Sequence, residues 1–384
     1  MRATAVIFGG RSVEHDISII TAHIPIIETL LASQKFDVWP VYIAKDGSWY
    51  SNKKMNDLAY FKQPEFEEQL QREKRIQLSF DEGLSIVWPG VLSKSVHIDV
   101  VFPSMHGTFG EDGSLMGLLR MAGVPYVGCD MTSSAIAMDK VLTKQVLAQE
   151  GIPLVPSTWF TKKEWEDEKE SVLKRISKLK FPLFVKPAHL GSSIGITKVK
   201  TESELQNALE VGIHYDDKIL VEEGVQNLIE VTLPIMGDDV PRPALVERPL
   251  NKGELFDFDG KYMHGGKKGA GANSAYSEIP ANIGEKLTAQ ITELGKKVYE
   301  IIGCSGIARV DFLIDSVTKN VYVIEVNTMP GSLYHHNWKK AGVSDTELVL
   351  WLVRMAEDRF KAQANTNFTF RSDILNKING PKTQ

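Results

Sequence analysis

The sequence predicts an α/β protein, α+β over the whole chain, whose first domain is a doubly wound α/β unit. Short apolar runs typical of strands alternate with segments that have the apolar spacing of helices. Later in the chain, strand-like runs follow one another with only short polar turns between them. A length of 384 residues indicates two or three domains, at roughly 100–200 residues each.

The first domain is expected to open with a strand over residues 5–8, which ends at the turn formed by Gly9 and Gly10. Residues 18–32 have helical periodicity. Pro25 should kink or restart this helix, because proline has no N–H to give to a helix interior.

A second strand is expected around residues 38–43, where Pro40 indicates that the strand begins late or lies at a sheet edge. The polar stretch 45–75 has weak periodicity and is expected to decorate the domain. A buried strand over residues 97–102 and a helix over 113–122 complete the unit.

The rest of the chain predicts a second and a third unit followed by a polar tail. The expected helices cover residues 133–150, 202–211 and 285–302, and the expected strands cover 181–186, 195–198, 219–222, 230–236, 243–247, 309–315 and 322–327. The expected domains are 1–128, 129–218 and 219–360, with a tail over 361–384.

Composition narrows the class of protein. The net charge is −5, which gives no electrostatic reason to bind nucleic acid. The two cysteines, Cys129 and Cys304, lie far apart and lack metal-ligand spacing, which favours a reduced, intracellular setting. The chain enters a strand without a signal-type segment and has no apolar run long enough to span a bilayer. We therefore expect a soluble cytoplasmic protein that does not engage membranes.

The most informative stretch is the pair of strands 309–315 and 322–327. Side chains alternate faces along a strand, so Arg309 and Asp311 share one face. On the partner strand, Glu325 and Asn327 are expected to face away from Tyr322, Ile324 and Val326. In a hairpin, Asp311, Glu325 and Asn327 converge. Two carboxylates and an amide oxygen suit Mg²⁺ held together with phosphate. A solvated polar face of an antiparallel hairpin is the alternative for any one of these residues.

Two glycine-rich loops are candidates for phosphate contact. Residues 186–195 join two strands, and Lys186 adds a positive charge to backbone N–H groups that can cradle phosphate. Residues 261–273 combine glycines with lysines, a composition that suits a lid that closes over phosphates. The alternatives are an ordinary β-turn and a disordered surface loop. Neither segment is a P-loop or a dinucleotide fingerprint.

Two N-terminal motifs, at residues 9–18 and 106–114, lie where strands are expected to end, which is where α/β sheets bind ligands. Glu14 could receive a substrate ammonium group and His106 a carboxylate. Glu222 and Glu230 lie near later strand ends and could contact a nucleotide. A structural role or a solvated surface charge is the alternative for each residue taken singly.

Read together, six ordered motifs resemble those of the D-alanine–D-alanine ligase family of the ATP-grasp superfamily. They lie at residues 9–15, 106–113, 137–140, 185–195, 309–312 and 325–331. The resemblance covers residues 4–355 and implies a three-domain ATP-grasp architecture. ATP would lie between the second and third domains, and two D-alanine molecules between the first and third. The resemblance also implies a homodimer that binds ATP and D-alanine and serves peptidoglycan precursor synthesis.

The resemblance implies a role for each matching residue. ATP would be held by Lys140, Lys186, Glu222, Val225 and Glu230, with Lys261 on phosphate from the lid. Two Mg²⁺ or Mn²⁺ ions would be bound by Asp311, Glu325 and Asn327, and Arg309 would stabilise charge in the transition state. The first D-alanine would be held by Glu14 and His106, with Ser192 and Tyr262 hydrogen bonded to Glu14.

The pocket for the second substrate departs from the family pattern. After Gly331 the family has a threonine and then a serine–leucine pair that holds the second carboxylate, whereas this chain reads Ser332 to Trp338. Placed without gaps, the pair falls on His336 and Asn337; with a shifted loop it falls on Ser332 and Leu333. D-Serine or D-lactate as second substrate, or a non-catalytic ATP-binding homologue, are the alternative functions.

Overall fold

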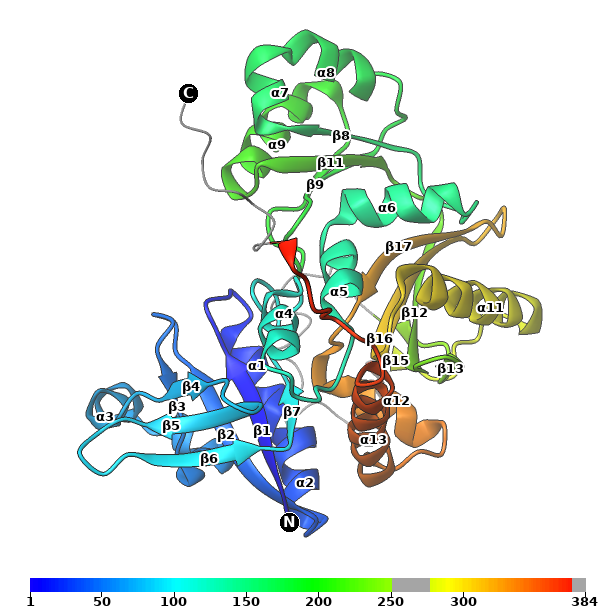
Figure 1. The fold of residues 1–384 in the computed structure, drawn as a ribbon. Coiled ribbons are helices and arrows are strands. Elements are labelled where there is room, and N and C mark those ends of the chain that lie inside the picture. The colour runs from blue at the N-terminus through cyan, green and yellow to red at the C-terminus, as the bar shows by residue number, and fades with distance from the viewer. Residues whose placement is uncertain (251–276, 375–384) are drawn as a thin grey trace.

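The computed structural model describes residues 1–250 and 277–374. Its first domain is built on a sheet of order β3-β2-β1-β7, in which β1 (Arg2–Gly9) pairs in parallel with β2 (Phe36–Ile43) and β7 (Val100–Pro103). The short strand β3 (Trp49–Tyr50) adds to β2 in antiparallel fashion. Figure 1 shows this domain in blue and cyan.

Helices cover both faces of this sheet, which confirms the doubly wound prediction. Val6 and Phe8 point to a core shared with Ile26 and Leu30, whereas alternate residues of β1 pack against helix α4 (Ser114–Met121). The first face is covered by α1 (His15–Thr21), η1 (Ala22–Ile27) and α2 (Glu28–Ala32). The segment that contains Pro25 is a π-helix between two α-helices, and the backbone at Thr21 and Ile27 keeps helical φ and ψ. The helix therefore runs on through Pro25 with a local change of hydrogen-bond pattern instead of restarting there.

Two predictions in this domain need correction. The strand β2 begins at Phe36 rather than late, but β3 pairs with only its last two residues, so Pro40 lies on an open edge as expected. The single strand expected over 97–102 is two strands in different sheets, β6 and β7. Asp99 separates them, because its carboxylate accepts a hydrogen bond from the N–H of Ala3 at 2.7 Å and turns the chain toward β1.

The polar stretch 45–75, expected to decorate the first domain, forms β3 and short helical turns, and together with the small sheet that follows it in the chain it makes up an insertion. Its strands are β4 (Gln77–Ser79), β5 (Leu84–Trp88) and β6 (Lys94–Ile98), and its helical turns are η2 (Lys53–Asn56), η3 (Leu58–Lys62) and α3 (Phe66–Arg72). Trp88, Leu78 and Val96 pack against the same core as α4. The small sheet therefore packs in the same core as α4, whereas Phe61 of η3 packs against Tyr42 near the end of β2.

The central domain is an antiparallel sheet of order β10-β9-β11-β8. Its elements are β8 (Ser157–Thr161), α7 (Lys162–Asp167), α8 (Lys169–Ile176), β9 (Leu183–Pro187), β10 (Thr197–Val199), α9 (Glu202–Tyr215) and β11 (Lys218–Glu223). Helices α8 and α9 bury one face of this sheet. β11 lies inside it, so the sheet continues past the boundary that we expected at residue 218.

The single helix expected over 133–150 is two helices, α5 (Met131–Met138) and α6 (Lys140–Gln149). Asp139 separates them because its backbone is extended and its Oδ1 accepts from the N–H groups of Val141 and Leu142 at 2.9 and 3.0 Å. This cap sets the direction of α6, which lies between the central sheet and the third domain (Figure 1).

The third domain is an antiparallel sheet of order β13-β12-β16-β17, covered by α11 (Glu285–Ile302). Its strands are β12 (Leu228–Gly237), β13 (Arg242–Pro243), β16 (Gly306–Asp315) and β17 (Val321–Asn327), and a second, two-stranded sheet is formed by β14 (Arg248–Pro249) and β15 (Ser277–Glu278). The strand expected over 243–247 is reduced to β13 and one bridge between Glu247 and Thr232.

The hairpin prediction is confirmed: β16 and β17 pair with Asp311 opposite Glu325. One detail is wrong, because Tyr322 lies opposite Leu313 on the half-buried face that carries Asp311. The register shifts between Asp311 and Phe312, which skips Ile324 and moves the early part of β17 to the other phase.

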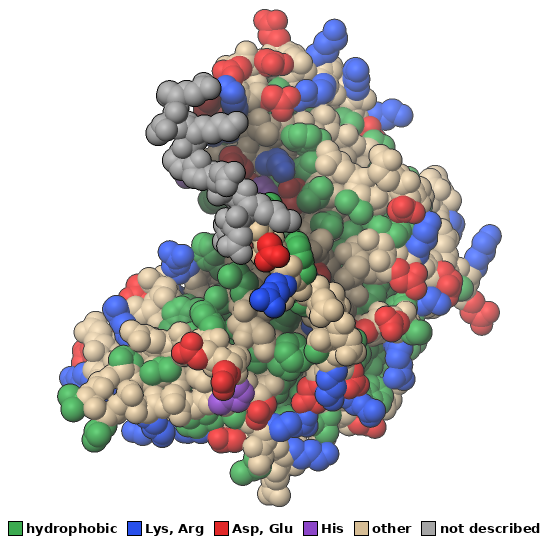
Figure 2. All heavy atoms as spheres, in the orientation of Figure 1, with side chains coloured by type: hydrophobic (Ala, Val, Ile, Leu, Met, Phe, Trp, Pro, Cys, Tyr) green, Lys and Arg blue, Asp and Glu red, His purple; other side chains and the backbone are tan. Residues whose placement is uncertain are grey.

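The chain closes with η4 (Gly331–Tyr334), α12 (His335–Lys340) and α13 (Asp345–Gln363). Leu348 and Leu352 of α13 belong to the core that contains Val6 of the first domain, so α13 joins the first and third domains. None of the described helices is long and apolar enough to cross a membrane. Figure 2 shows acidic and basic side chains interspersed on one face, which is hollowed between the upper and lower left lobes.

Candidate active site

Glu14 lies in the loop after β1, just before α1, with 6 % of its surface exposed. Ser192, from the glycine-rich loop of the central domain, donates a hydrogen bond to Glu14 Oε1. A Cβ on Gly107 (φ +69°) would lie 2.9 Å from Glu14 Oε2, and one on Gly191 3.3 Å from the same oxygen. The carboxylate is thus packed between two loops that approach closely because they carry glycine.

His106 is buried beside Glu14, and Glu111, whose side chain is 14 % exposed, lies next to His106. Burial lowers the pKa of His106, so its imidazole is neutral at pH 7. Burial, together with the nearby charge of Glu14, raises the pKa of Glu111 to about 8. The N–H of Gly107 donates to Glu111 Oε2 at 2.7 Å. At neutral pH Glu111 therefore holds a proton.

Arg309, Asp311 and Asn327 form one cluster on the half-buried face of the hairpin. Arg309 Nε and Nη2 donate to the two carboxylate oxygens of Asp311 at 2.7 and 2.6 Å. Asn327 Nδ2 donates to Asp311 Oδ2 at 3.1 Å. Glu325 is directly opposite Asp311 in the register. The predicted convergence of the two carboxylates and the amide is present.

Lys140 connects this cluster to the central domain. Its Nζ lies 3.6 Å from Glu325 Oε1 and donates to the carbonyl of Leu190 at 2.7 Å. The side chain is 11 % exposed. Lys140 is the first residue of α6, which is held in place by its Asp139 cap. A cation at this point lies between the carboxylates of the hairpin and the loop that carries Ser192.

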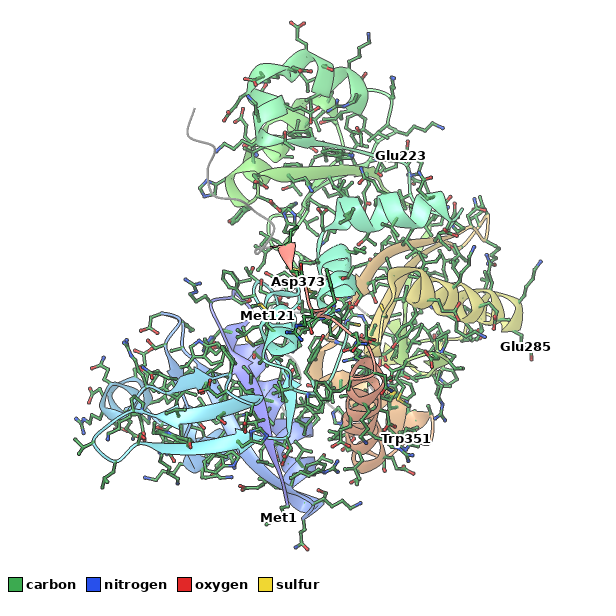
Figure 3. The ribbon with its side chains drawn as sticks, in the orientation of Figure 1. Met1, Met121, Glu223, Glu285, Trp351 and Asp373 are labelled. Carbon is green, nitrogen blue, oxygen red and sulfur yellow. The ribbon has the colours of Figure 1, made fainter. Side chains whose placement is uncertain are left out.

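Lys186 and Glu222 lie on adjacent strands of the central sheet. Lys186 Nζ contacts Glu222 Oε1 directly, and Lys144 of α6 contacts Glu222 Oε2 at 3.0 Å. Burial alone would raise the pKa of Glu222, but the two lysines lower it to about 2. Figure 3 labels Glu223, the last residue of β11, beside helix α6. Lys144 is part of the site although the sequence interpretation did not include it.

The loop over residues 189–195 is anchored by His189. The imidazole Nδ1 lies 3.0 Å from Asp216 Oδ1, and Nε2 lies 3.4 Å from Asp139 Oδ2. Hydrogen bonds to Asp139 and Asp216 raise the pKa of His189 to about 9, so it is a cation at pH 7. His189, Asp216 and Asp217 could together offer ligands to a metal ion, but a protonated imidazole has no lone pair for one.

Val225 and Glu230 follow Glu222 along the chain. Val225 lies in the loop between β11 and β12, and Glu230 lies near the start of β12, opposite Leu313 of β16. Both positions border the region between the central sheet and the third domain. Lys261 and Tyr262, the predicted lid residues, lie outside the described residues.

The segment after β17 has an unusual backbone. Ser332, Leu333 and Tyr334 are consecutive non-glycine residues with φ of 47°, 54° and 51°. Such conformations cost energy and cluster at functional sites. The N–H of Ser332 donates to Thr21 Oγ1 at 3.1 Å, and His106 Nε2 is 2.9 Å from the same oxygen. The segment is therefore tied to the Glu14 group through Thr21.

The other predicted residues of this pocket lie differently. Asn337 is fully buried; its Nδ2 donates to Leu245 O and Glu247 Oε2 at 3.0 Å each, so both amide hydrogens are used. His336 has a half-exposed side chain whose Nε2 lies 3.0 Å from Glu247 Oε2. A Cβ on Gly331 would meet nothing within 4 Å among the described residues. Among the described candidates, Ser332 is the one whose hydrogen bond leads to His106, because both bond to Thr21 Oγ1.

Several site residues were missed by sequence reasoning, and some had a signal. Lys144 follows Lys140 by four residues on an expected helix, a spacing that places both on one face. Glu111 lies inside the motif at 106–113, whose histidine was selected. Thr21 and Glu247 had no local signal, because only tertiary contacts bring them to the site.

The comparisons with known proteins agree with this arrangement. Residues 3–129 match the family model described as D-ala D-ala ligase N-terminus, and residues 146–354 match D-ala D-ala ligase C-terminus. The chain is 34 % identical over 372 residues to a D-alanine–D-alanine ligase of Natranaerobius thermophilus, covering 95 % of this chain and 98 % of the relative. It is 36 % identical over 377 residues to the ligase of Bacillus velezensis, covering 94 % and 100 %.

Solved structures show the same likeness. The D-alanine–D-alanine ligase from Coxiella burnetii superposes with a TM-score of 0.79 at 30 % identity, covering 94 % of this chain and 96 % of that one. The VanG D-Ala:D-Ser ligase from Enterococcus faecalis superposes with a TM-score of 0.75 at 29 % identity, covering 92 % and 99 %. Both family models match this chain, and its relatives are similar over almost their whole length. This chain therefore belongs to the D-alanine–D-alanine ligase family.

Proposed function

We propose that this protein joins two D-alanine molecules into D-alanyl-D-alanine at the expense of ATP, for peptidoglycan precursor synthesis. Three groups of side chains support the proposal: an anionic group around Glu14, a carboxylate and arginine cluster on the hairpin, and a row of lysines on α6 and β9. The single observation that carries it is the pair of contacts of Lys140, which link the hairpin carboxylates to the loop that touches Glu14.

Glu14 is proposed to bind the ammonium group of the first D-alanine. The side chain is buried and Ser192 orients it, so an ammonium would meet a fixed carboxylate. His106, which is neutral at pH 7, would contact the substrate carboxylate. Tyr262 is proposed, from the sequence motif, to join Ser192 as a hydrogen-bond partner of Glu14.

ATP is proposed to lie between the central sheet and the third domain. Lys140 and Lys186 would hold its phosphates, and Lys261 would add a contact from the lid. Glu222 and Val225 would bind the adenine, and Glu230 the ribose. The burial of Glu222 supports this role, because a buried carboxylate accepts a hydrogen bond from the exocyclic amine of adenine more strongly than an exposed one does.

The hairpin residues fit two Mg²⁺ or Mn²⁺ ions. Asp311, Glu325 and Asn327 supply carboxylate and amide oxygens, the donors that Mg²⁺ prefers together with substrate phosphate. When bound, the ions would neutralise phosphate charge and act as Lewis acids on the transferred group. The two-point contact with Arg309 fixes the plane of the Asp311 carboxylate.

The chemistry needs no side-chain nucleophile. A carboxylate oxygen of the first D-alanine attacks the γ-phosphorus of ATP, the bond to the β-phosphate oxygen breaks, and ADP leaves. The amine of the second D-alanine then attacks the acyl carbon, the bond to the phosphate oxygen breaks, and phosphate leaves with the peptide formed. Arg309 stabilises the charge that develops, and Lys140 and Lys186 hold the phosphates in line.

The second carboxylate is proposed to bind at Ser332 and Leu333. This alternative is supported by Thr21, whose Oγ1 is hydrogen bonded both to the N–H of Ser332 and to His106. Both amide hydrogens of Asn337 are already used by Leu245 and Glu247, which disfavours the gapless placement. Because this chain is similar to the VanG D-Ala:D-Ser ligase, D-serine is a second candidate acceptor. We also propose a cytoplasmic homodimer, which sedimentation of the purified chain would test.

The purified protein, incubated with ATP, Mg²⁺ and D-alanine, should release ADP and phosphate in step with dipeptide. The acceptors D-alanine, D-serine and D-lactate should be supplied together across pH and the products separated by mass spectrometry. D-Alanyl-D-alanine should dominate at mildly basic pH. A dominant D-alanyl-D-serine product would show that D-serine is the preferred acceptor. ATP binding without any product would contradict the proposal that the protein is an enzyme.

A further inference from the structure

Lys144 is a buried cation for which the proposed chemistry has no role. Only 7 % of its surface is exposed, and it projects from the second turn of α6. Its Nζ contacts Glu222 Oε2 at 3.0 Å and the carbonyl of Val155 at 3.4 Å. A buried lysine is retained at a site only when it is paired, because the desolvation of an ammonium group is costly. Its partner therefore indicates its purpose.

The sheet register explains why Glu222 has two cations. Leu220 lies opposite Lys186, and Glu222 lies opposite Phe184, so Lys186 and Glu222 are diagonal neighbours on one face. Val185 and Val221 point to the other face, into the core beneath α8 and α9. The face that carries Glu222 is closed by α6, which brings Lys144 to the second carboxylate oxygen.

The two lysines differ in what they can do next. The Lys186 side chain is 15 % exposed and the Lys144 side chain 8 %. Lys144 is also fixed through the carbonyl of Val155, whereas Lys186 has a hydrogen bond to Glu222 and lies 5.7 Å from the centre of the Phe184 ring. One carboxylate between two ammonium groups leaves one positive charge in excess. Lys186 can therefore move to a phosphate while Glu222, buried in a low-dielectric site, stays paired with Lys144.

We propose that Lys144 is the permanent counter-charge of Glu222, which releases Lys186 to the ATP phosphates. The proposal rests on the function above, in which Lys186 binds phosphate and Glu222 binds adenine. Without Lys144, the move of Lys186 to phosphate would leave Glu222 buried and unpaired, and breaking such a pair is strongly unfavourable. Lys144 is therefore a positioning residue that couples the adenine end of the site to the phosphate end.

The test compares a non-hydrolysable ATP analogue with adenosine, by calorimetry on the full chain with Mg²⁺. Adenosine has no phosphate, so its binding does not require Lys186 to leave Glu222. Lys144→Met should raise the dissociation constant of the analogue by roughly tenfold or more, and that of adenosine by much less. Lys144→Arg should restore most of the difference. Lys163→Met, on an exposed lysine of α7 that pairs with Asp167, is the control and should change neither value.

Lys186→Met separates this inference from the function on which it rests. The affinity ratio is defined as the association constant of the analogue divided by that of adenosine. If Lys186→Met leaves this ratio unchanged, the phosphate role of Lys186 fails. If Lys186→Met lowers the ratio but Lys144→Met does not, only the inference fails. In the Lys186→Met background, Lys144→Met should have almost no further effect on the ratio. A persisting effect there, or equal weakening of both ligands by Lys144→Met alone, would overturn the inference.

A second pair keeps the test decisive if Lys144→Met does not fold. Glu222→Gln removes the buried charge, so Lys144 should no longer matter to the phosphate end. The variants Glu222→Gln and Glu222→Gln with Lys144→Met should then show the same ratio between the analogue and adenosine. A lower ratio in the double variant would mean that Lys144 acts on phosphate directly, which contradicts the inference.

Discussion

Arg309 and Asp311 lie two residues apart on β16, and the guanidinium of Arg309 donates hydrogen bonds to both carboxylate oxygens of Asp311 at 2.6 and 2.7 Å. Parallel hydrogen bonds of this kind fix orientation as well as charge. The residue proposed to stabilise the transition state thus also aims the residue proposed to bind metal. Their spacing of two places both side chains on one face of the strand.

Asp311→Asn and Glu325→Gln should each lose most turnover while the fold is kept. Each removes a negative charge from the proposed metal site and little packing, and loss of one charge-stabilising group costs about 10²–10³ in rate. Dipeptide formation and melting temperature should be measured together. Glu293→Gln, on an exposed residue of α11, is the matched control. Activity within a few-fold of the parent at unchanged melting temperature would remove these metal roles.

Glu14→Gln should raise the KM for the first D-alanine by about tenfold or more, because an ammonium would meet a neutral amide instead of a buried carboxylate. Ser192→Ala should have a smaller effect in the same direction, since Glu14 loses an orienting hydrogen bond but keeps its charge. The KM for ATP should change little in both variants. Equal changes in the two KM values would argue that the Glu14 group only supports the fold.

The stability that His189 contributes should fall at alkaline pH. Its folded-state pKa is raised to about 9 from 6.5, first by Asp139 and then by Asp216. The contribution is therefore complete below about pH 6.5 and is lost as pH rises through about 9. The difference in melting temperature between the parent and His189→Ala should shrink over that window. His214→Ala, on α9, is the control. A melting-temperature difference that does not depend on pH would contradict the role of protonated His189 between Asp139 and Asp216.

The segment 332–334 should control the second substrate. Ser332→Ala should raise the KM for the acceptor, measured with the first site saturated, whereas His336→Ala should change it by a few-fold at most. Thr21→Val should raise the KM values of both substrates, because Thr21 Oγ1 contacts both His106 and the N–H of Ser332. If His336→Ala raises the KM for the acceptor more than Ser332→Ala does, the acceptor site lies instead at His336 and Asn337.

Lys261→Ala and deletions within residues 265–271 should uncouple ATP consumption from dipeptide formation. A closed lid protects an acyl phosphate by excluding water. The ratio of phosphate released to dipeptide formed should rise above that of the parent. An unchanged ratio in a deletion variant would show that this segment does not protect the intermediate.

Much of the architecture follows from local patterns in the sequence. The alternation along residues 309–315 places Arg309 and Asp311 on one face, and the structure keeps it because Val310, Phe312 and Ile314 need a core on the other. Pro25 changes the local hydrogen-bond pattern of its helix from α to π, since proline has no N–H to donate. The failures were also local: Asp99 and Asp139 divided a predicted strand and a predicted helix by capturing backbone N–H groups.

The sequence by itself determined the residue types of the site, their order along the chain and the strand alternation that puts Arg309 and Asp311 on one face. Only the tertiary structure decided which distant groups meet. Glu14 meets Ser192 across 178 positions, and His106 reaches Thr21 across 85. Such contacts depend on how buried surfaces of separate domains fit, and no local periodicity encodes that fit. The second cation of Glu222 belongs to the same class, because its pairing arises where a helix closes over a sheet.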